Sequence, residues 1–361
     1  MSKMAREIRV GIAGGNANAG WTKLSHVPAI KALPGLRLAA VATRNEQSAR
    51  AAAEAFGADR WFSNPYAMIR DDEIDLVTIC VKVPAHRDLV MAALDAGKAV
   101  YCESPLGRSV AETEEMARAV RSNHTAIGLQ GRHNPAVRRA AELVSSGLIG
   151  RPLNATIRAP TVGWGPQLPV AYDFLNKLSS GVDLLTVTGA HTLDLAQVLL
   201  GPIIEVDART ETRWPVVKLI ESGEESVREV PDYVAVIGKT RSGALFSAEF
   251  EGGVQQENLR FSFELRGSEG WLRLTSNSPF GFQAGNVQLT SSVAFIEPEA
   301  TAVPSGTVET AINVGEVYAQ LARDLHDGAY RTPGFDHALA NARLIGAVLA
   351  AEWGKRRRPE T

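Results

Sequence analysis

The 361-residue chain is poor in cysteine, lacks long apolar runs and carries no excess of one charge sign. Its two cysteines, Cys80 and Cys102, close apolar runs without the spacing of metal ligands, so we expect buried reduced thiols. No stretch reaches the roughly 18 apolar residues of a membrane span. Residues 1–10 run into a strand pattern without the apolar core of a signal peptide. These absences predict a cytoplasmic protein with no membrane partner.

The balance of positive and negative charge indicates whether nucleic acid is an expected partner. Lysine and arginine number 38 against 40 aspartate and glutamate residues, a formal net charge of -2. This balance gives no electrostatic reason to expect nucleic acid as a partner. The only basic run, residues 355–358, lies at the C-terminal end. We interpret it as a solvated tail, with a targeting signal as the alternative.

Length and periodicity predict an N-terminal dinucleotide-binding domain over residues 1–130. The chain is longer than the roughly 250–300 residues at which a single core stops growing, so we expect two domains. Short apolar runs alternate with helix-like segments in the first 130 residues, which is typical of a parallel sheet covered on both faces. Such a doubly wound α/β domain binds ligands at the carboxyl ends of its strands. The expected strands are 8–13, 36–42, 74–81, 99–102 and 126–129, and the expected helices are 46–56, 85–96 and 110–121.

A second, α+β domain is predicted over residues 131–361. Its strands are longer and alternate, as in 259–266, where the odd-numbered residues are apolar and the even-numbered ones polar. Alternation of this kind predicts a large, mainly antiparallel sheet with one face on a core. The last helix is expected to pack back on the Rossmann domain. The expected strands include 233–239 and 244–251, and the expected helices are 134–146, 184–200, 309–327 and 335–355.

The first strand runs into a degraded dinucleotide fingerprint. Gly14 takes the tight turn and Ala19 the helix-packing position of the G-x-G-x-x-G/A pattern. Asn16, with Ala17 beside it, replaces the middle glycine that lets the backbone approach a pyrophosphate. Asparagine tolerates a positive φ better than most residues, so an anion-binding turn remains feasible. The alternative is a glycine turn without a ligand.

The end of the second strand favours NADP over NAD. An NAD site usually has aspartate or glutamate here to bind the ribose 2′-hydroxyl, and none occurs before Glu46. Thr43 and Arg44 stand there instead, and a guanidinium can bind a 2′-phosphate through two parallel hydrogen bonds. The alternative is a solvent-facing arginine at a helix start.

Several motifs in order resemble the Gfo/Idh/MocA oxidoreductase family over nearly the whole chain. The first motif covers residues 75–86 and 93–100, and the second covers 130–135, 142–143 and 147–150. The third is 189–194, and the fourth covers 335–339 and 343–344. A closer resemblance is to a regulatory branch, the NAD(P)-binding repressors of the fungal galactose regulon, which are sensors without known turnover. That resemblance rests on 16–17, 20–21, 26–30, 129–132 and 181–184.

The resemblance implies further site residues on both domains. His191 corresponds to the catalytic histidine and can act as acid or base near neutral pH. The alternative is a helix histidine satisfied by a neighbour such as Asp194, and these two residues give at best a two-ligand spacing, so no metal is expected. Residues implied to line the cofactor are Val81, Lys82, His86, Glu103, Ser104 and Gln130. Residues implied to bind substrate are Arg132, Trp164, Tyr172, Asp183 and His191.

Two departures from the dehydrogenase pattern leave two functions open. Family dehydrogenases carry a lysine where this chain has Ser104 and an aspartate where it has Val187. Serine cannot supply the positive charge that stabilises a developing alkoxide, and valine cannot orient an imidazole. Lys82, Asp183 and Tyr172 are the candidate replacements. The chain is therefore expected to be an oxidoreductase acting on a sugar or polyol, or a sensor that uses the same pocket without turnover.

Self-association is also expected. An antiparallel sheet that is apolar on both faces needs a partner for the face its own helices leave bare. The family resemblance points to a homodimer or homotetramer built through that sheet. The candidate interface residues are Tyr233, Phe246, Phe250, Phe261 and Phe263.

Overall fold

The computed structural model describes residues 7–18 and 20–351, and the chain separates into two compact units. The first unit combines the chain up to Pro135 with Pro298–Ala340, and the second combines Ala136–Glu297 with the chain from Asn341 onward. The boundary expected at residue 130, and the packing of the last helix, stay predictions. Ala19 and the basic run 355–358 lie outside the described residues.

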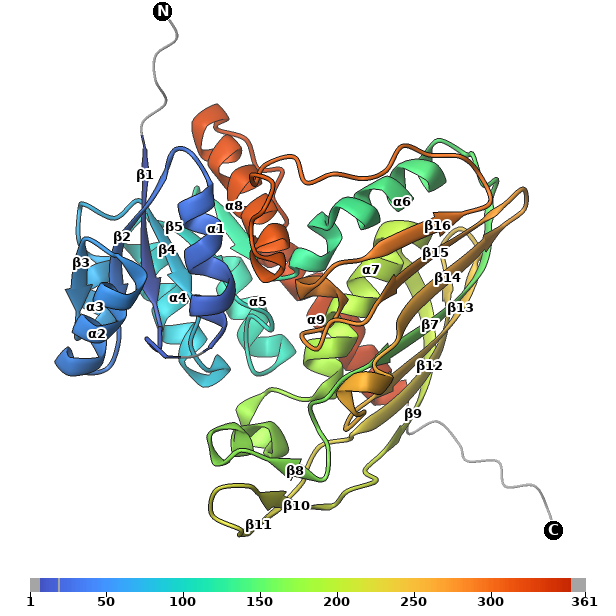
Figure 1. Cartoon of the computed structure of the whole chain (residues 1–361), viewed down its shortest axis with the longest axis horizontal. Helices are drawn as coiled ribbons and strands as arrows, with labels where there is room; N and C mark the ends of the chain where they lie inside the picture. The colour runs from blue at the N-terminus through green and yellow to red at the C-terminus, as the bar shows by residue number, and fades with distance from the viewer. Residues whose placement is uncertain (1–6, 19, 352–361) are drawn as a thin grey trace, which may run out of the picture. The chain divides into compact units, whose positions relative to one another are not determined.

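The first unit is built on a parallel sheet (Figure 1). Among the residues that the structure describes, its strands have the order β3-β2-β1-β4-β5-β6. This order places the reversal of winding between β1 and β4, where doubly wound folds bind their ligands. The Rossmann fold expected from the alternating pattern is confirmed. The strands are β1 Ile8–Ala13, β2 Leu36–Ala42, β3 Arg60–Phe62, β4 Leu76–Ile79, β5 Ala99–Cys102 and β6 Thr125–Ile127.

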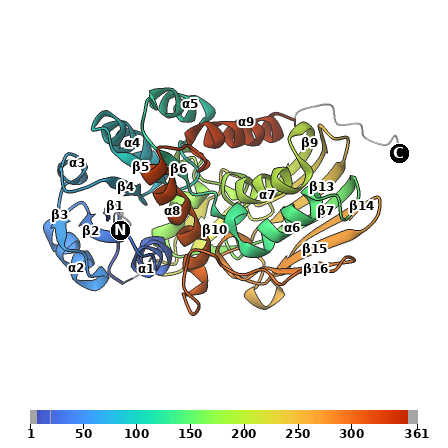
Figure 2. The same cartoon turned by 90° about the horizontal axis from the view of Figure 1, so that it is seen from above.

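Helices cover both faces of this sheet (Figure 2). On one face lie α1 (Val27–Ala32), α2 (Glu46–Phe56) and α8 (Glu309–Asp327), whose apolar residues form one core cluster with the strands. On the other lie α3 (Pro65–Ile69), α4 (His86–Asp95) and α5 (Val110–Ala119). Helix α8 comes from a segment that lies in the chain between the two parts of the second unit, and it packs against α1.

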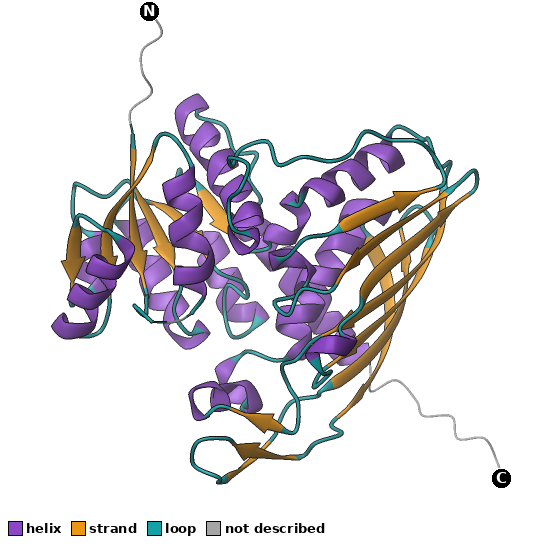
Figure 3. Ribbon diagram, viewed as in Figure 1, coloured by secondary structure: helices purple, strands orange, loops and turns teal. Residues whose placement is uncertain are grey.

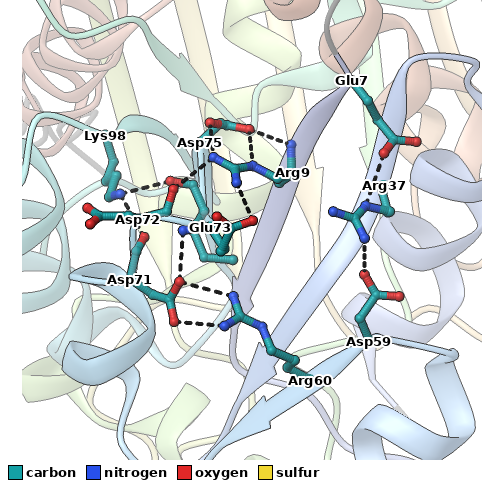
Figure 4. Close-up of polar contacts among 11 residues, drawn as sticks. Glu7, Arg9, Arg37, Asp59, Arg60, Asp71, Asp72, Glu73, Asp75 and Lys98 are labelled. Carbon is teal, nitrogen blue, oxygen red and sulfur yellow. Dashed lines mark hydrogen bonds and ion pairs between the residues drawn. The ribbon is translucent and has the colours of Figure 1, made fainter.

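Ion pairs tie together the amino-terminal edge of the sheet (Figure 4). Arg9, in β1, donates through Nε to Asp75 at 2.8 Å, and its Nη1 lies 2.5 Å from a Glu73 oxygen. Arg60 binds both carboxylate oxygens of Asp71 at 2.9 and 3.0 Å. This charged network lies at the end of the strands opposite to the ligand edge, so we assign it to stability.

The second unit contains a large sheet (Figure 3), in which the strands that the structure describes have the order β16-β15-β14-β7-β13-β12-β9 (Figure 1). Only the β7–β13 pair within it is parallel, so the expected mainly antiparallel sheet is confirmed. Its strands are β7 Pro152–Pro160, β9 Ile203–Glu211, β12 Tyr233–Thr240, β13 Leu245–Glu251, β14 Phe261–Gly267, β15 Trp271–Ser276 and β16 Gln288–Ser291. A smaller sheet joins β8 Gln167–Leu168, β10 Val216–Leu219 and β11 Glu225–Val227.

The helices α6 (Pro135–Ser145) and α7 (Ala190–Leu200) lie on one face of the large sheet (Figures 1 and 2). Helix α9 (Phe335–Ala351) is the last described element, and no described helix is both long and apolar enough to cross a membrane. The short helical turns are η1 Thr22–His26, η2 Val83–Ala85, η3 Gln130–His133, η4 Val170–Asn176, η5 Leu178–Ser180, η6 Leu185–Gly189, η7 Gln256–Asn258 and η8 Phe282–Ala284.

One expectation about the faces of the large sheet is wrong. The side chains of Phe246, Phe250, Phe261 and Phe263 are at most 6% exposed and belong to the core of the unit itself. Of the five aromatic residues expected at an interface, only Tyr233 lies on the outer face. Neighbouring strands pair in a register that sets which residues share a face, and the strand pattern alone did not establish which face the helices cover.

Candidate functional site

The strand register of the first unit brings the candidate cofactor residues to one edge. Ala42, Ala13, Ile79, Cys102 and Ile127 form one row across the sheet, from β2 through β1, β4 and β5 to β6. Each candidate residue follows its strand by only a few positions. The segments carrying them therefore succeed one another along the carboxyl edge of the strands, the edge at which doubly wound domains bind ligands.

The glycine turn after β1 is tight enough to require its glycine. Gly14 has a φ of +102°, and a Cβ there would lie 2.3 Å from the backbone oxygen of Cys80. Its carbonyl oxygen accepts a hydrogen bond from the Thr22 hydroxyl at 3.1 Å, which fixes the turn to η1. Glycine is therefore required here for the turn after β1 to pack against the segment after β4.

Asn16 and Ala17 keep their expected place in the turn, but Asn16 does not use a positive φ. Trp164 is the only non-glycine with a positive φ in the described part of the chain. The Asn16 side-chain oxygen instead accepts from the backbone N–H of Asn18 at 2.9 Å. An asparagine can thus replace the middle glycine because its side chain closes the turn locally.

Thr43 and Arg44 have different roles at the end of β2. The Thr43 hydroxyl lies 2.6 Å from that of Ser48 and donates to the Asn45 carbonyl at 3.1 Å, so it helps to cap α2. Arg44 is exposed and has no hydrogen-bond or ion-pair partner among the described residues. Arg44 directly precedes Asn45, the N-cap of α2, and both a guanidinium and the N-terminal end of a helix attract an anion.

The nearest carboxylate at this end of the sheet is already engaged. Glu46 forms an ion pair with Arg50, the guanidinium of which lies 4.7 Å from the centre of the Trp61 ring. A carboxylate held in this way is less available to accept from a ribose 2′-hydroxyl.

Val81, Lys82 and His86 follow β4. Val81 is half-buried and Lys82 is exposed at the start of η2. His86 is buried, and its ring nitrogens lie 3.0 Å from the Val81 oxygen and 3.1 Å from the Pro105 oxygen. Burial lowers the pKa of His86. A neutral ring has one N–H and donates to only one of these carbonyls, while its Nδ1 also lies 3.4 Å from Sγ of Cys102. The side chain of His86 therefore joins the segments after β4 and β5.

The segments after β5 and β6 carry the other cofactor candidates. Glu103 and Ser104 follow β5 and are half-buried. Gln130, which begins η3, is only 2% exposed, and its side-chain oxygen has no hydrogen-bond partner in the described structure. A buried acceptor without a donor costs free energy, and a ligand amide or hydroxyl would remove that cost. The Gly14 turn and this oxygen both fit a dinucleotide.

A buried histidine that is not among the residues predicted from the sequence lies under the same edge. His26, in η1, lies 3.0 Å from a carboxylate oxygen of Glu103 and 2.9 Å from the hydroxyl of Tyr318. The only sequence signal was its place in a motif shared with the regulatory branch of the family. Tyr318 stands in α8, 292 positions further along the chain, and no local pattern connects the two.

Arg132 is the one candidate substrate residue of the first unit. It lies in η3, and its Nη1 is 2.7 Å from Nε2 of His337, in the first turns of α9. Both residues are half-buried. The contact holds the guanidinium against the segment that carries His337.

In the second unit, Asp183 directly precedes the helical segment that carries His191. His191 is 7% exposed in the first turn of α7. Asp183 accepts from the backbone N–H of Thr186 at 2.7 Å, and the Thr186 hydroxyl accepts from the N–H of Asp183 at 2.8 Å. Burial raises the pKa of Asp183. This reciprocal pair is a helix cap, so the carboxylate already has a structural role.

Trp164 is held in a strained backbone conformation by buried charges. Its φ is +56°, a region that costs a bulky residue about 1–3 kcal/mol. Arg228 donates to the Trp164 carbonyl and, through its other terminal nitrogen, to the Gly165 carbonyl, both at 2.7 Å. The indole N–H is buried and has no hydrogen-bond partner among the described residues. Backbone strain of this kind is often found at functional positions, and the buried N–H is a hydrogen-bond donor that the described protein atoms leave unused.

Tyr172, in η4, is 48% exposed. Its ring lies 6.3 Å from that of Phe174. Within the second unit the structure therefore provides a buried histidine, a buried indole N–H and an exposed phenol on separate elements.

Comparison with known proteins defines the class. Residues 8–130 match the oxidoreductase family with an NAD-binding Rossmann fold, and residues 135–276 match the Gal80p C-terminal domain. The chain belongs to the Gfo/Idh/MocA family, close to its Gal80-like members. The family comprises NAD-binding oxidoreductases of sugars and polyols and has Gal80 regulators among its relatives.

Two relatives and one solved structure illustrate this position. The galactose/lactose metabolism regulatory protein GAL80 of Saccharomyces cerevisiae is 28% identical over 76% of this chain and 68% of its own length. The levoglucosan dehydrogenase of Pseudarthrobacter phenanthrenivorans is also 28% identical, over 73% of each chain. A super-repressor mutant of Gal80p from Saccharomyces cerevisiae superposes with a TM-score of 0.84, at 25% identity and 96% coverage of both chains. Alignments with three curated relatives span 60–68% of those proteins.

Proposed function

We propose that this protein binds NADP(H) and exchanges hydride with a sugar or polyol. The observation that carries the proposal is the row of candidate segments along one sheet edge, with Arg44, whose guanidinium has no partner among the described residues, at the β2 end. The pyrophosphate would meet the backbone of the Gly14 turn, where a Cβ has no room. Arg44 would bind the 2′-phosphate, and Gln130 would accept a hydrogen bond from the far half of the nucleotide.

The substrate side is assigned to residues of the second unit. The nicotinamide would supply or accept the hydride, while His191 would hold or release the proton of the substrate hydroxyl. The buried indole N–H of Trp164 would donate to a second hydroxyl, and its ring offers an apolar surface to a sugar face. Lys82, Asp183 and Tyr172 are the groups that could take over from the lysine and aspartate this chain lacks.

A non-catalytic sensor is the second candidate, and Ser104 and Val187 are the residues that favour it. Of the three groups that usually donate, accept or orient the proton during hydride transfer, the lysine and the aspartate are absent. General acid–base assistance is worth about 10²–10⁴ in rate, so an unassisted site would turn over slowly. The similarity to GAL80, a regulatory protein, supports the same alternative.

Measurement of turnover separates the two candidates. The wild type is mixed with NADP and a panel of sugars and polyols, and the reduced-nicotinamide absorbance is followed in a stopped-flow instrument. An enzyme turns over at least one compound, and His191→Ala lowers that rate at least about tenfold. A sensor shows no wild-type turnover, and Ser104→Lys combined with Val187→Asp creates or raises alcohol oxidation. A high turnover rate that does not change when His191, Lys82, Asp183 or Tyr172 is substituted would contradict the assignment of the site.

A further inference from the structure

Four polar side chains form a hydrogen-bonded chain beneath the carboxyl edge of the Rossmann sheet. The Thr78 hydroxyl, in β4, lies 2.7 Å from that of Tyr318 in α8. The Tyr318 hydroxyl lies 2.9 Å from Nδ1 of His26, and Nε2 of His26 lies 3.0 Å from Oε1 of Glu103. Four separate elements of the first unit thus contribute one group each.

The chain of groups opens to a ligand at one end only. Thr78, His26 and Tyr318 are fully buried, whereas the Glu103 side chain keeps 17% of its surface exposed. The second carboxylate oxygen of Glu103 has no hydrogen-bond partner among the described residues. The residue behind Glu103 is a glycine, Gly128, and a Cβ there would lie 2.8 Å from Oε1. The carboxylate is therefore held between His26 and the Gly128 backbone with one oxygen left over.

The network keeps its bonds in both protonation states of the histidine. An imidazolium donates to Glu103 and to the Tyr318 oxygen, and Tyr318 then donates to Thr78. A neutral ring that keeps its proton on Nε2 still donates to Glu103, while Tyr318 turns its hydroxyl proton toward Nδ1 and accepts from Thr78. Burial by itself lowers the pKa of His26, but Tyr318, Cys80 and Glu103 outweigh it, and the pKa lies well above its ordinary value.

Fold stability alone is a poor reason for this arrangement. Buried ionic groups contribute little net stability, because the cost of desolvation offsets their attraction. The ring of Tyr101 packs in the same core, with its centre 5.2 Å from that of His26. The Tyr101 hydroxyl is buried and has no hydrogen-bond partner in the described structure. Packing at this place therefore does not require a hydroxyl to be bonded. The bonded groups converge on the one carboxylate that a ligand can reach.

We propose that His26, held by Tyr318 and Thr78, is a positioning residue that fixes Glu103 to accept hydrogen bonds from the nicotinamide–ribose half of the dinucleotide. This inference rests on the proposed function. Arg44 after β2 would take the adenosine 2′-phosphate, so the other half extends toward β4 and β5, on the far side of β1. Ribose hydroxyls and the carboxamide N–H groups are donors that suit a carboxylate acceptor.

The test compares two nucleotides on the purified full-length protein. NADP carries both halves, whereas adenosine 2′,5′-bisphosphate carries only the half assigned to Arg44. His26→Gln should lower the affinity for NADP about tenfold, a typical effect for a hydrogen bond to a charged group, and leave the bisphosphate affinity within about twofold. Tyr318→Phe should lower the NADP affinity less, about threefold, because Glu103 keeps its bond to His26.

Tyr101→Phe is the matched control. It removes a hydroxyl of the same kind, equally buried and against the same histidine, but one without a partner, so both affinities should stay at the wild-type values. If His26→Gln does not fold, Tyr318→Phe and Gly128→Ala, which presses on the Glu103 carboxylate, decide the question in the same way. General damage to the domain would lower both affinities together and would overturn the inference. So would unchanged NADP affinity in the folded variants. A wild type that binds neither nucleotide would refute the proposed function itself.

Discussion

Arg44 is the residue on which the choice of cofactor depends. Its exposed guanidinium has no partner among the described residues, so no existing bond must break before it binds a phosphate. We expect the wild type to bind NADP more tightly than NAD. Arg44→Ala should lose about 1.5–3 kcal/mol of NADP binding, a typical value for hydrogen bonds to charged groups, and leave NAD binding unchanged.

Titration of tryptophan fluorescence with both nucleotides measures this difference. Arg70→Ala is the control, because Arg70 is also exposed, has no described partner and follows α3 on the side of the amino-terminal edge. It removes the same charge without touching the proposed site. Equal affinities of the wild type for NADP and NAD would contradict the prediction.

Asp183 provides a second test at the scale of one residue. Its carboxylate can act as a helix cap or as a proton donor, and the two roles require different chemical groups. As a cap it needs only an acceptor oxygen, which asparagine also provides, so Asp183→Asn should keep the fold while Asp183→Ala costs about 1 kcal/mol. As a proton donor it needs the carboxyl group, and both variants would then lower turnover. Urea unfolding and turnover, measured on both variants, distinguish the roles.

The pH dependence of Asp183 has a defined sign. Its pKa is raised by burial above the ordinary 3.8, so the folded state binds more protons than the unfolded state as pH rises through that range. The contribution of Asp183 to stability is therefore full below about pH 3.8 and is lost as pH rises through the folded pKa. Asp183→Asn lacks this loss, so its stability relative to the wild type should increase from acid to neutral pH. A constant difference across this range would show that burial does not perturb the carboxyl group.

At the scale of the element, a buried ion pair holds the strained Trp164 segment to the strands around it. Arg228 and Asp232 are fully buried, 3.1 Å apart, and Asp232 also accepts from the backbone N–H groups of Arg213 and Trp214. Asp232→Ala leaves the Arg228 guanidinium without its counter-charge, which should cost about 3–5 kcal/mol.

Denaturant unfolding measures that loss, and Glu264→Ala is the control. Glu264 pairs with Arg273 at 3.0 Å, but both side chains are about half exposed, so its loss should cost about 0–1 kcal/mol. Arg228→Met combined with Asp232→Asn should cost less than Asp232→Ala, since no charge is left unpaired. Equal effects of Asp232→Ala and Glu264→Ala would show that the buried pair does not hold this segment.

At the scale of the whole molecule, the outer face of the seven-stranded sheet is where we expect a second copy to bind. Ile237 and Leu245, on neighbouring strands, are 61% and 57% exposed there. They line a groove of about 580 Å³ together with charged residues such as Glu205 and Lys239. Exposed apolar side chains that gather on one face favour burial against a partner.

The double variant Ile237→Glu with Leu245→Glu should weaken this association. Light scattering should give a multiple of the 38.7 kDa chain mass for the wild type and the single mass for the variant. Ile296→Glu is the control, because Ile296 is 78% exposed in the loop region after β16 and lies outside the groove. A wild type with the mass of one chain at micromolar concentration would refute the prediction.

The sequence by itself determined most of the helices and strands of the first unit and the doubly wound class of its parallel sheet. Apolar periodicity is a local property, so it located β1, β2, β5, α2 and α8 to the residue. Parallel strands separated by helices bring all their carboxyl ends to one edge, which predicts without coordinates that Gly14, Arg44 and Gln130 follow strands at the same edge. The sequence did not predict the short strands β3 and β8. They have three and two residues, which are too few to show a hydrophobic period.

Only the tertiary structure decided which polar groups meet and which face is open. His26 and Tyr318 are 292 positions apart, and the sequence carries no sign that α8 brings them into contact beneath Glu103. The inward turn of the four phenylalanines follows from which face α6 and α7 cover, a property of packing and not of alternation. The positive φ of Trp164 likewise depends on Arg228, far along the chain. Local patterns are set by neighbours in sequence, whereas hydrogen bonds, burial and strain are set by neighbours in space.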